Sequence, residues 1–420
     1  MKVLVIGSGG REHAVIRKLA ENKEIDKIFC APGNGGISVL AQPVDIKATD
    51  IDGMVNFAKA EGIGFAVVTP DDPLVLGMAD ALEAAGIPAF GPSKAAAQIE
   101  GSKVFAKNLM KKYGIPTAKY EVFDDPAQAI AYIQQENRFP AVIKADGLAL
   151  GKGVVIAQNL DEAKEAVHSI MEDRIFGQSG SQVVVEEFLT GKEVSVLAFT
   201  DSHTVVPMVS SMDHKRAYDD DQGPNTGGMG TIAPNPYYTA EAAKRCMEEI
   251  FLPTIEAMKK EGCPFKGCLY FGLILTEQGP KVIEYNCRFG DPETQVVLPL
   301  LKTDLFTIFK AVREERLDQL DIRWSDGAAA CVILASGGYP KKYETGFSIE
   351  GLDEEGQYPG VIVYHAGTKR QNGQFVTAGG RVLGVTGLGK DLPQALEKAY
   401  DAVKKIRFPK AHYRTDIGKK

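Results

Sequence analysis

The chain has 420 residues, a formal net charge of −7 and a hydrophobic content of 44%. That length is too great for a single hydrophobic core, so we expect two or three domains. The acidic balance argues against a general nucleic-acid-binding protein, because such a protein needs a basic surface to neutralise the phosphate backbone.

Residues 1–92 alternate between short apolar runs and helical segments. Strands are predicted at residues 2–6, 28–30, 65–68 and 88–90. This alternation indicates a parallel sheet with helices on its faces. Ligands of such sheets bind beyond the carboxyl ends of the strands, so the loops at residues 7–13 and 69–74 are candidate binding segments.

The first of these loops is rich in glycine and is predicted to lead into a helix from about Glu12. It matches the beginning of the G-x-G-x-x-G dinucleotide fingerprint, but Glu12 occupies the position of the third glycine, which makes NAD the weaker choice. Backbone N–H groups at a helix start, together with Arg11, suit a phosphate or another small anion. A tight turn that needs glycine only for its backbone dihedral angles is the alternative without a ligand.

Residues 93–113 are predicted to be helical, with a domain boundary near residue 100. Beyond them, a predicted strand at 140–145 carries Lys144 and leads into a glycine-rich hairpin at 146–153. The glycines let the backbone approach a phosphate, while Lys144 supplies a positive charge. The hairpin differs from a Walker A loop, because a strand follows it and not a helix. A mobile hairpin without a ligand is the alternative.

Polar segments continue through the middle of the chain. A predicted strand at 182–189 runs into a turn, where Glu187 and Glu193 are candidates for binding ribose hydroxyls, although a plain hairpin with acidic residues is the alternative. Residues 211–230 are predicted to form a long polar loop, and loops of that length in compact domains are functional or disordered. The charged residues beside its glycines favour a binding loop. A helix at 238–260 follows, and then a buried strand at 267–275.

The stretch at residues 281–295 carries a concentrated set of polar side chains. It begins as a strand that pairs with 267–275, and Glu284 and Asn286 leave the same face of it. Carboxylate and amide oxygens are hard ligands, suited to Mg²⁺ ions shared with phosphates, and Arg288 adds a cation beside them. Such a set fits phosphoryl transfer, in which charge develops on phosphate oxygens. In isolation, a polar strand face turned to water would be the better interpretation.

From about residue 324 the pattern changes again, to predicted strands at 328–335, 361–364 and 380–385 and a helix at 392–406. These elements predict a small α+β third domain. The run at 328–335 is the longest uninterrupted apolar run, and it is far too short to span a membrane. The six cysteines have neither metal-binding nor disulfide spacing, which indicates a reducing, cytoplasmic location. Cys287 is predicted to be a core residue.

With these segments in order, the chain resembles the ATP-grasp ligases, and more closely the phosphoribosylamine–glycine ligase (glycinamide ribonucleotide synthetase) family. The resemblance runs from end to end and rests on residues 7–14, 143–153, 186–189, 213–216, 223–230, 284–293, 379–384 and 413–418. The lysine, the glycine-rich hairpin and Glu-x-Asn alone would indicate only an ATP-grasp protein. The first loop, the 213–230 segment and the tail narrow the resemblance to this family.

The resemblance implies an α/β and α+β multidomain fold. Residues 1–100 would form a Rossmann-like parallel-sheet domain that binds substrate. Residues 101–325 would form the ATP-grasp core, with a small lid subdomain at about 121–188. Residues 326–420 would form the C-terminal α+β domain.

The resemblance also implies a reaction and its ligands. Glycine is phosphorylated by ATP to glycyl phosphate and then joined to 5-phosphoribosylamine, giving glycinamide ribonucleotide, ADP and phosphate in purine biosynthesis. Mg²⁺ or Mn²⁺ would bind Glu284 and Asn286. The implied ATP-binding residues are Lys103, Lys144, Gly147, Gly151, Lys152, Gly153, Glu186, Glu187, Phe188, Leu189 and Glu193. The implied substrate-binding residues are Gly9, Gly10, Arg11, Asp213, Thr226, Gly227, Gly228, Met229, Asp291, Pro292 and Glu293. The implied catalytic residues are Arg288, Lys144 and Asp213.

The expected partners are these small molecules, with no nucleic acid and no membrane, and the expected oligomeric state is a monomer. One departure from the family pattern stands at residues 69–71, where Thr-Pro-Asp replaces the usual Gly-Pro-Glu, which puts a substrate hydrogen bond from Asp71 in doubt. Two other functions stay open: an ATP-grasp enzyme with a different carboxylate and amine, and a nucleotide-binding regulatory protein. Intact Lys144, Glu284, Asn286 and Arg288 argue against the second, because a sensor needs no complete transfer site.

Overall fold

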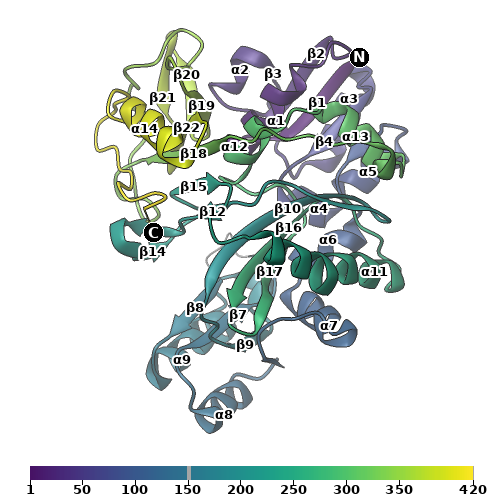
Figure 1. Ribbon diagram of the computed structural model, residues 1–420, viewed down its shortest axis with the longest axis vertical. Coiled ribbons are helices and arrows are strands. Elements are labelled where there is room, and N and C mark those ends of the chain that lie inside the picture. The colour runs from purple at the N-terminus through teal and green to yellow at the C-terminus, as the bar shows by residue number, and fades with distance from the viewer. Residues whose placement is uncertain (149–152, 420) are drawn as a thin grey trace.

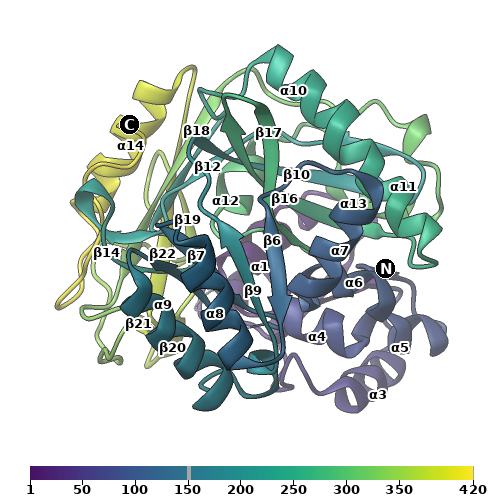
Figure 2. The same cartoon turned by 90° about the horizontal axis from the view of Figure 1, so that it is seen from below.

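The computed structural model describes residues 1–148 and 153–419 (Figure 1). An N-terminal sheet and a C-terminal sheet occupy the upper part of the view, a central sheet lies below them, and a smaller sheet lies at the lower end. Figure 2 shows the small sheet from below, with α6 and α7 beside it. Within the described ranges, none of the helices has both the length and the apolar composition needed to cross a membrane.

The N-terminal sheet is parallel, with strand order β3-β2-β1-β4-β5. Its strands are β1 (Lys2–Gly7), β2 (Lys27–Pro32), β3 (Gln42–Pro43), β4 (Phe65–Val68) and β5 (Ala89–Phe90). Its helices are α1 (Gly10–Leu19), α2 (Ile37–Leu40), α3 (Ile51–Glu61), α4 (Asp71–Leu76) and α5 (Met78–Ala84). The parallel sheet predicted from the alternation of strands and helices is therefore confirmed.

Two details of this region differ from the sequence prediction. Helix α1 begins at Gly10, before the predicted start at Glu12, because the Glu12 carboxylate turns back and accepts a hydrogen bond from the Gly9 N–H at 2.5 Å. Glu12 therefore caps its own helix. The segment 69–74, predicted to be a loop, begins helix α4 at Asp71. Its first turn contains acidic residues, which interact favourably with the helix dipole and so favour a helix over a loop.

The small sheet is antiparallel and has strand order β6-β9-β7-β8. Its strands are β6 (Tyr120–Phe123), β7 (Ala141–Ala145), β8 (Val154–Ala157) and β9 (Val183–Glu187), and its helices are α8 (Pro126–Glu136), α9 (Leu160–Val167), the π-helical turn η1 (His168–Glu172) and the 3₁₀ turn η2 (Gly177–Gly180). It has an apolar core of its own, in which Ile143 and Val183 of the sheet pack against Ile133 of α8 and Val167 of α9.

The central sheet has strand order β11-β10-β16-β17 and is also antiparallel. Its strands are β10 (Lys192–Asp201), β11 (Val205–Pro207), β16 (Lys266–Thr276) and β17 (Gly279–Asn286). The helices around it are α6 (Lys94–Gly101), α7 (Lys103–Tyr113), α10 (Ala240–Cys246), the π-helical turn η4 (Met247–Phe251), α11 (Leu252–Lys260), α13 (Leu305–Arg313) and the 3₁₀ turn η6 (Leu317–Gln319). The short helix α12 (Thr294–Val297) and the 3₁₀ turn η5 (Leu298–Leu300) follow β17 and pack against α1 and β18. The predicted pairing of 267–275 with 281–286 is confirmed.

The C-terminal sheet has strand order β12-β15-β18-β22-β19. Its strands are β12 (Met212–Asp213), β15 (Gly230–Ala233), β18 (Ala328–Ala335), β19 (Ile362–His365) and β22 (Arg381–Gly389). Helix α14 (Leu392–Val403) packs on it, and two ribbons stand beside it: β13 (Arg216–Tyr218) with β14 (Gln222–Asn225), joined by the 3₁₀ turn η3 (Asp219–Asp221), and β20 (Thr368–Gln371) with β21 (Gln374–Thr377). The prediction of a long loop at 211–230 is wrong, because this segment contains β12, the first ribbon and the start of β15.

Helix α13 packs between the N-terminal and central sheets. Phe306 meets the ring of Phe65 edge-on at 5.2 Å, and Phe309 stacks on Phe90 at 3.9 Å. These rings belong to one continuous apolar core that also includes residues of β10 and β16. The shared core fixes the N-terminal glycine-rich loop relative to the end of β17, where the polar residues gather.

Candidate active site

Glu284 and Asn286 leave the same face of β17, opposite Gly272 and Tyr270 of β16. The Glu284 carboxylate lies 3.3 Å from the Nζ of Lys215, which follows β12. The positive charge of Lys215, with smaller contributions from other lysines nearby, lowers the pKa of Glu284 to about 2 despite burial. The carboxylate is therefore ionised at neutral pH, with cations gathered around it.

Asn286 and Arg288 are held by a buried glutamate that the sequence did not single out. Glu100, at the end of α6, accepts hydrogen bonds from Asn286 Nδ2 at 2.9 Å, from the Cys287 N–H at 2.7 Å and from Arg288 Nη2 at 2.8 Å. Arg288 also lies 3.8 Å from a carboxylate oxygen of Asp71. Its Nε has no hydrogen-bond partner among the described residues. Cys287 is fully buried, as predicted.

The end of β17 fits a divalent cation only if phosphates complete the site. The side-chain amide of Asn286 gives its N–H to Glu100, which leaves the amide oxygen beside the ionised Glu284 as a hard ligand. Among the described residues, no group of three or more His, Cys, Asp and Glu side chains could hold a metal ion. Two protein oxygens, with the rest from phosphate and water, is the arrangement typical of Mg²⁺.

A buried triad of two lysines and one carboxylate lies at the junction of the small and central sheets. Glu186 of β9 pairs with Lys144 of β7 at 3.0 Å and with Lys107 of α7 at 2.9 Å. Lys144 also donates to the carbonyl of Ile283 at 3.1 Å. Burial lowers the pKa of Lys107 to about 8, although Glu186 opposes the shift. The excess of positive charge in this triad suits an anionic ligand such as a polyphosphate.

The glycine-rich hairpin lies next to this triad. Lys103, at the start of α7, donates from Nζ to the Gly147 carbonyl at 3.0 Å, which brings a third lysine to the hairpin. The carbonyl of Gly153, which has no side chain, accepts a hydrogen bond from the Ala145 N–H at 2.8 Å. The predicted residues Gly151 and Lys152 lie outside the described residues.

Between Glu284 and the C-terminal sheet lies a second polar cluster, around a small cavity. The cavity is lined by Glu193, Val194, Ser195, Asp213, Lys215, Tyr270, Gly272, Leu273, Ile283 and Glu284. Burial, with the nearby charge of Glu293, raises the pKa of Asp213 well above its ordinary value, and burial also raises the pKa of Glu293. The half-buried Asp213 and the buried Glu293 repel one another, so both would gain from an ammonium group between them.

Gly228 brings the glycine-rich segment close to these carboxylates. Its φ is +115°, and a Cβ there would lie 2.5 Å from Pro292 and 2.6 Å from a carboxylate oxygen of Asp213, so only glycine fits. Thr226 shapes the turn, since its hydroxyl accepts from the Gly228 N–H at 3.0 Å and donates to the Lys215 carbonyl at 2.8 Å. The predicted Met229 is fully buried, and its N–H already donates to the His214 carbonyl.

The first glycine-rich loop reaches this cluster through Asp291. The Arg11 N–H lies 3.2 Å from a carboxylate oxygen of Asp291, and Arg11 Nη1 donates to the Phe289 carbonyl at 3.2 Å. From β22, Arg381 donates to the carbonyls of Gly227 at 2.8 Å and Asp291 at 2.9 Å. The N-terminal loop, the glycine-rich segment and the segment after β17 thus meet at one place.

Two of the adenine and ribose candidates, Glu187 and Phe188, lie nearer the surface than the triad. Phe188 is 40% exposed, and Glu187 accepts a hydrogen bond from the Lys119 N–H at 3.0 Å. Glu193 lines the cavity beside Glu284. Leu189 lies just after β9, and Gly10 is the first residue of α1.

Three consecutive parts of the sequence match domains of one protein family. Residues 1–100, 101–294 and 329–420 match, in that order, the phosphoribosylglycinamide synthetase N domain, its ATP-grasp (A) domain and its C domain. The chain belongs to the phosphoribosylglycinamide synthetase family. A phosphoribosylamine–glycine ligase of Caldanaerobacter subterraneus subsp. tengcongensis is 50% identical to it over 99% of both chains. Another, from Vibrio vulnificus, is 47% identical over 100% of this chain and 98% of its own.

Solved structures agree with this assignment to the synthetase family. The crystal structure of phosphoribosylamine–glycine ligase from Thermotoga maritima has a TM-score of 0.86 and 33% identity, and the match covers 100% of both chains. The biotin carboxylase domain of 2-oxoglutarate carboxylase from Hydrogenobacter thermophilus, solved with MgADP, has a TM-score of 0.75 over 98% of this chain and 91% of its own. At 18% identity the second likeness concerns the fold alone. The predicted resemblance and multidomain fold are confirmed.

Four residues of the candidate site are absent from the residues predicted from sequence: Glu100, Lys107, Lys215 and Arg381. Local signals existed for two of them. Lys107 stands four residues after Lys103 on α7 and therefore lies on the same helix face. Lys215 stands two residues after Asp213, next to the start of a ribbon. Glu100 and Arg381 reach the site only through contacts between distant elements, so their roles follow from the fold.

The Lys215–Glu284 ion pair is expected to make the free energy of unfolding depend on acidic pH. The pKa of Glu284 falls from an ordinary 4.5 to about 2 in the folded chain, so the stabilisation is complete above about pH 4.5 and is lost as the pH falls through about 2. In Lys215→Met this part of the dependence is expected to shrink, because the main charge that lowers the pKa is removed. Chemical denaturation of both proteins from neutral pH down to about pH 3 measures it, and parallel curves would contradict the assignment.

Proposed function

We propose that this chain joins glycine to 5-phosphoribosylamine in an ATP-dependent reaction that gives glycinamide ribonucleotide, ADP and phosphate, a step of purine (IMP) biosynthesis. The observation that carries the proposal is the polar face at the end of β17, where Glu284, Asn286 and Arg288 stand among lysines from several elements. Transfer to a carboxylate needs positioning and charge neutralisation and no nucleophilic side chain. Full-length relatives named phosphoribosylamine–glycine ligase support this reaction over other ATP-grasp reactions.

In the first step, a carboxylate oxygen of glycine forms a bond to the γ-phosphorus of ATP, and the bond to the β,γ-bridging oxygen breaks, releasing ADP. Lys103 and Lys144 neutralise the phosphate oxygens in this proposal, and Arg288 stabilises the charge on the transferred group. Asp213 and Glu293 hold the glycine ammonium. The raised pKa of both carboxyls is consistent with a site that takes up a cation.

In the second step, the amine of phosphoribosylamine attacks the carbonyl carbon of glycyl phosphate. The new C–N bond forms, the C–O bond to phosphate breaks, and the nitrogen loses a proton. In this proposal Arg11, the adjacent glycines and Asp291 bind this substrate, and the contact of the N-terminal loop with the segment after β17 supports their acting together. Arg381 donates to the carbonyls of both Gly227 and Asp291, which supports glycine and phosphoribosylamine lying in adjacent positions.

We place the nucleotide between the small sheet, which acts as a lid, and the central sheet. The residues proposed to contact it are Lys103, Lys144, Gly147, Gly151, Lys152, Gly153, Glu186, Glu187, Phe188, Leu189 and Glu193. Glu284 and Asn286 would hold Mg²⁺ or Mn²⁺, which supplies charge neutralisation at the phosphates when bound. The triad of Lys107, Lys144 and Glu186 supports this placement. It connects the lid to α7, beside the central sheet, where the phosphates of the nucleotide would bind.

The unusual Asp71 retains a carboxylate at the substrate end of the site. Burial raises its pKa, but the charges of Arg288 and Arg11 outweigh burial and lower the pKa overall. Asp71 therefore stays ionised, in contact with the arginine of the transfer site. We propose that it replaces the family's usual glutamate from the first turn of α4.

Phosphate release from ATP and Mg²⁺ tests the function. Release that requires both glycine and freshly made phosphoribosylamine, and that fails with alanine in place of glycine, is the expected result. Release with a different carboxylate and amine would favour another ATP-grasp ligase. Binding of ATP without turnover under all these conditions would favour a regulatory protein.

A monomer and a cytoplasmic location complete the proposal. All six cysteines carry free, buried thiols, which suits a reducing compartment. Sedimentation of the purified chain measures the oligomeric state, and a stable dimer would contradict the first expectation.

A further inference from the structure

The last residues of the chain lie across the segment that carries the proposed glycine site. We call residues 412–418 the C-terminal tail and residues 213–230 the acceptor segment. Figure 1 shows the C-terminus beside β14 of the acceptor segment. The two are about 200 residues apart in sequence, and their contacts include ion pairs and hydrogen bonds.

Arg414 is the centre of these contacts. Its side chain is fully buried and makes a two-pronged ion pair with Asp416, at 2.7 Å from Nε and 2.8 Å from Nη2. Its Nη1 donates to Asp221 at 3.0 Å and to the Arg216 carbonyl at 3.2 Å. Asp416 holds the buried guanidinium within the tail, and its Nη1 bonds to β13 and to the turn that follows, which fixes the ribbon of the acceptor segment.

The turn between the two strands of the ribbon is held from the same side. Asp219 accepts hydrogen bonds from the N–H and the hydroxyl of Thr415, at 2.8 Å and 2.5 Å. The Asp220 N–H donates to Asp416 at 3.0 Å. His412 Nε2 lies 2.6 Å from the Ala217 carbonyl. Each residue from 217 to 221, apart from Tyr218, therefore has a bond to the tail in this structure.

A separate bond reaches the residue next to Asp213. The Gly418 N–H donates to His214 Nε2 at 3.1 Å, so His214 Nδ1 is the protonated nitrogen and faces the Gly230 carbonyl at 3.2 Å. The His214 N–H lies 2.8 Å from a carboxylate oxygen of Asp213. The tail thereby orients the backbone from which the proposed ammonium ligand projects.

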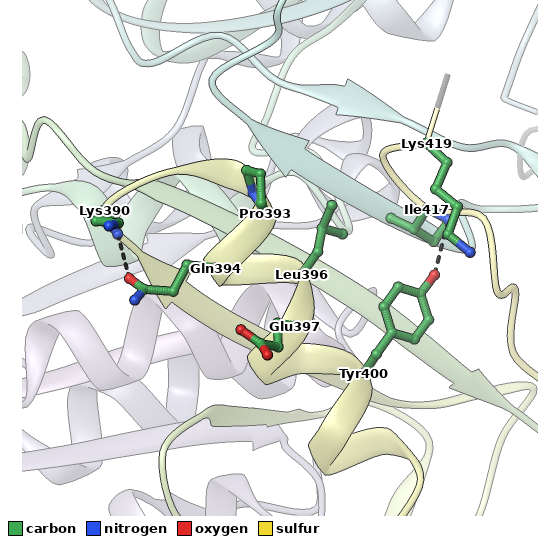
Figure 3. Close-up of a pocket in the computed structure, with 8 residues that line it drawn as sticks. All are labelled: Lys390, Pro393, Gln394, Leu396, Glu397, Tyr400, Ile417 and Lys419. Carbon is green, nitrogen blue, oxygen red and sulfur yellow. Dashed lines mark hydrogen bonds between the residues drawn. The ribbon is translucent and has the colours of Figure 1, made fainter.

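The tail is itself fixed to the C-terminal sheet. Figure 3 shows Tyr400 of α14 beside Ile417, whose N–H donates to the tyrosine hydroxyl at 3.0 Å. The Ile417 side chain is fully buried, and a Cβ on Gly230 would lie 2.7 Å from it. The pocket drawn in Figure 3 is lined mainly by residues of α14, together with Ile417 of the tail. The acceptor segment is thus connected through the tail to a rigid sheet and helix.

We propose that the C-terminal tail is a clasp that positions Asp213 and the Gly227–Gly228 backbone for glycine, with Arg414 as its main positioning residue. The proposal rests on the proposed function, because it assigns glycine to the acceptor segment. Apart from Glu193, the residues proposed to contact ATP lie on the small sheet, its hairpin and α7, and the tail contacts none of those that the structure describes, so loss of the clasp acts chiefly on glycine and changes ATP binding much less.

Steady-state kinetics of Arg414→Ala in the full chain tests the clasp. We expect the KM for glycine to rise about tenfold and the KM for ATP to change less than about twofold, because misplaced positioning groups affect only the substrate they hold. Arg414→Lys is expected to recover part of the loss, since it keeps the charge but not the two-pronged geometry. Amide hydrogen exchange is expected to be faster in residues 213–230 of Arg414→Ala and unchanged in β1.

Thr415→Val and Lys410→Ala serve as the mild variant and the matched control. Thr415→Val removes only the hydroxyl that donates to Asp219, so a smaller rise in the KM for glycine of about threefold is expected even if Arg414→Ala does not fold. Lys410→Ala removes an exposed ion pair with Glu344 just before the tail and is expected to change neither KM.

The outcomes separate the clasp from the proposed function. An unchanged KM for glycine in folded Thr415→Val and Arg414→Ala would overturn the clasp, as would equal rises of both KM values. If the wild-type chain shows no glycine-dependent turnover, the proposed function fails. The hydrogen-exchange comparison still decides in that case, because unchanged exchange in residues 213–230 would show that the tail does not order the segment.

Discussion

Glu284→Gln is expected to lower kcat about a thousandfold, because it removes a pre-placed charge from a phosphoryl-transfer site. Glutamine keeps the size of the side chain, but it cannot balance the lysines that now lower the pKa of this carboxyl to about 2. It is also a weaker ligand for a divalent cation. Phosphate release at saturating ATP, glycine and phosphoribosylamine measures the effect, and titration with Mg²⁺ tests whether the required metal concentration rises.

Glu277→Gln is the matched control for this experiment. Glu277 is an exposed glutamate in the turn between β16 and β17, so it shares a hairpin with Glu284 but lies at the opposite end of β17. Its replacement is expected to leave kcat and the metal requirement unchanged. A kcat for Glu284→Gln within about tenfold of the wild type would remove Glu284 from the transfer site.

The elements that sequence reasoning predicted well are those whose pattern is local. The strands of the N-terminal sheet are short apolar runs separated by helices, and at the end of β17 the half-buried Glu284 and Asn286 flank the buried Tyr285 by simple alternation. The pair Glu284 and Asn286 follows from that alternation alone. The helix predicted from residue 93 begins as α6 directly after Ser93, whose hydroxyl accepts from the Ala96 N–H at 3.2 Å. In each case the signal and the structure lie within a few residues of one another.

The acceptor segment shows why the rest could not be predicted. Residues 211–230 are polar and rich in glycine, as a loop would be. Their strands form because β15 pairs with β18, roughly a hundred residues later in the chain, and because the tail supplies partners for the ribbon. No local pattern contains that information. Glu100 could not be predicted for the same reason. The three groups that donate hydrogen bonds to it belong to residues 286–288, far from it in the sequence.

Arg288→Lys is expected to lower kcat about a hundredfold while the chain stays folded, because a lysine keeps the charge and loses the planar fork. In the wild type the guanidinium spans Glu100 at 2.8 Å, the Phe289 carbonyl at 3.3 Å and Asp71 at 3.8 Å. A single ammonium cannot hold all of these positions and also face a transferred phosphoryl group. Single-turnover phosphate release measures the loss of catalysis, and the melting temperature of the same preparation shows whether the chain stays folded.

Arg288→Ala adds a loss of stability that can be separated from catalysis. It leaves the buried Glu100 without its cation, and breaking such a pair costs about 3 kcal/mol of unfolding free energy. Burial already raises the pKa of Glu100 above its ordinary value, so the uncharged Glu100→Gln is the natural partner substitution. The double variant Arg288→Ala/Glu100→Gln is therefore expected to regain most of the stability and none of the activity. Recovery of activity together with stability would show that Arg288 serves only the fold, and that another cation stabilises the transferred group.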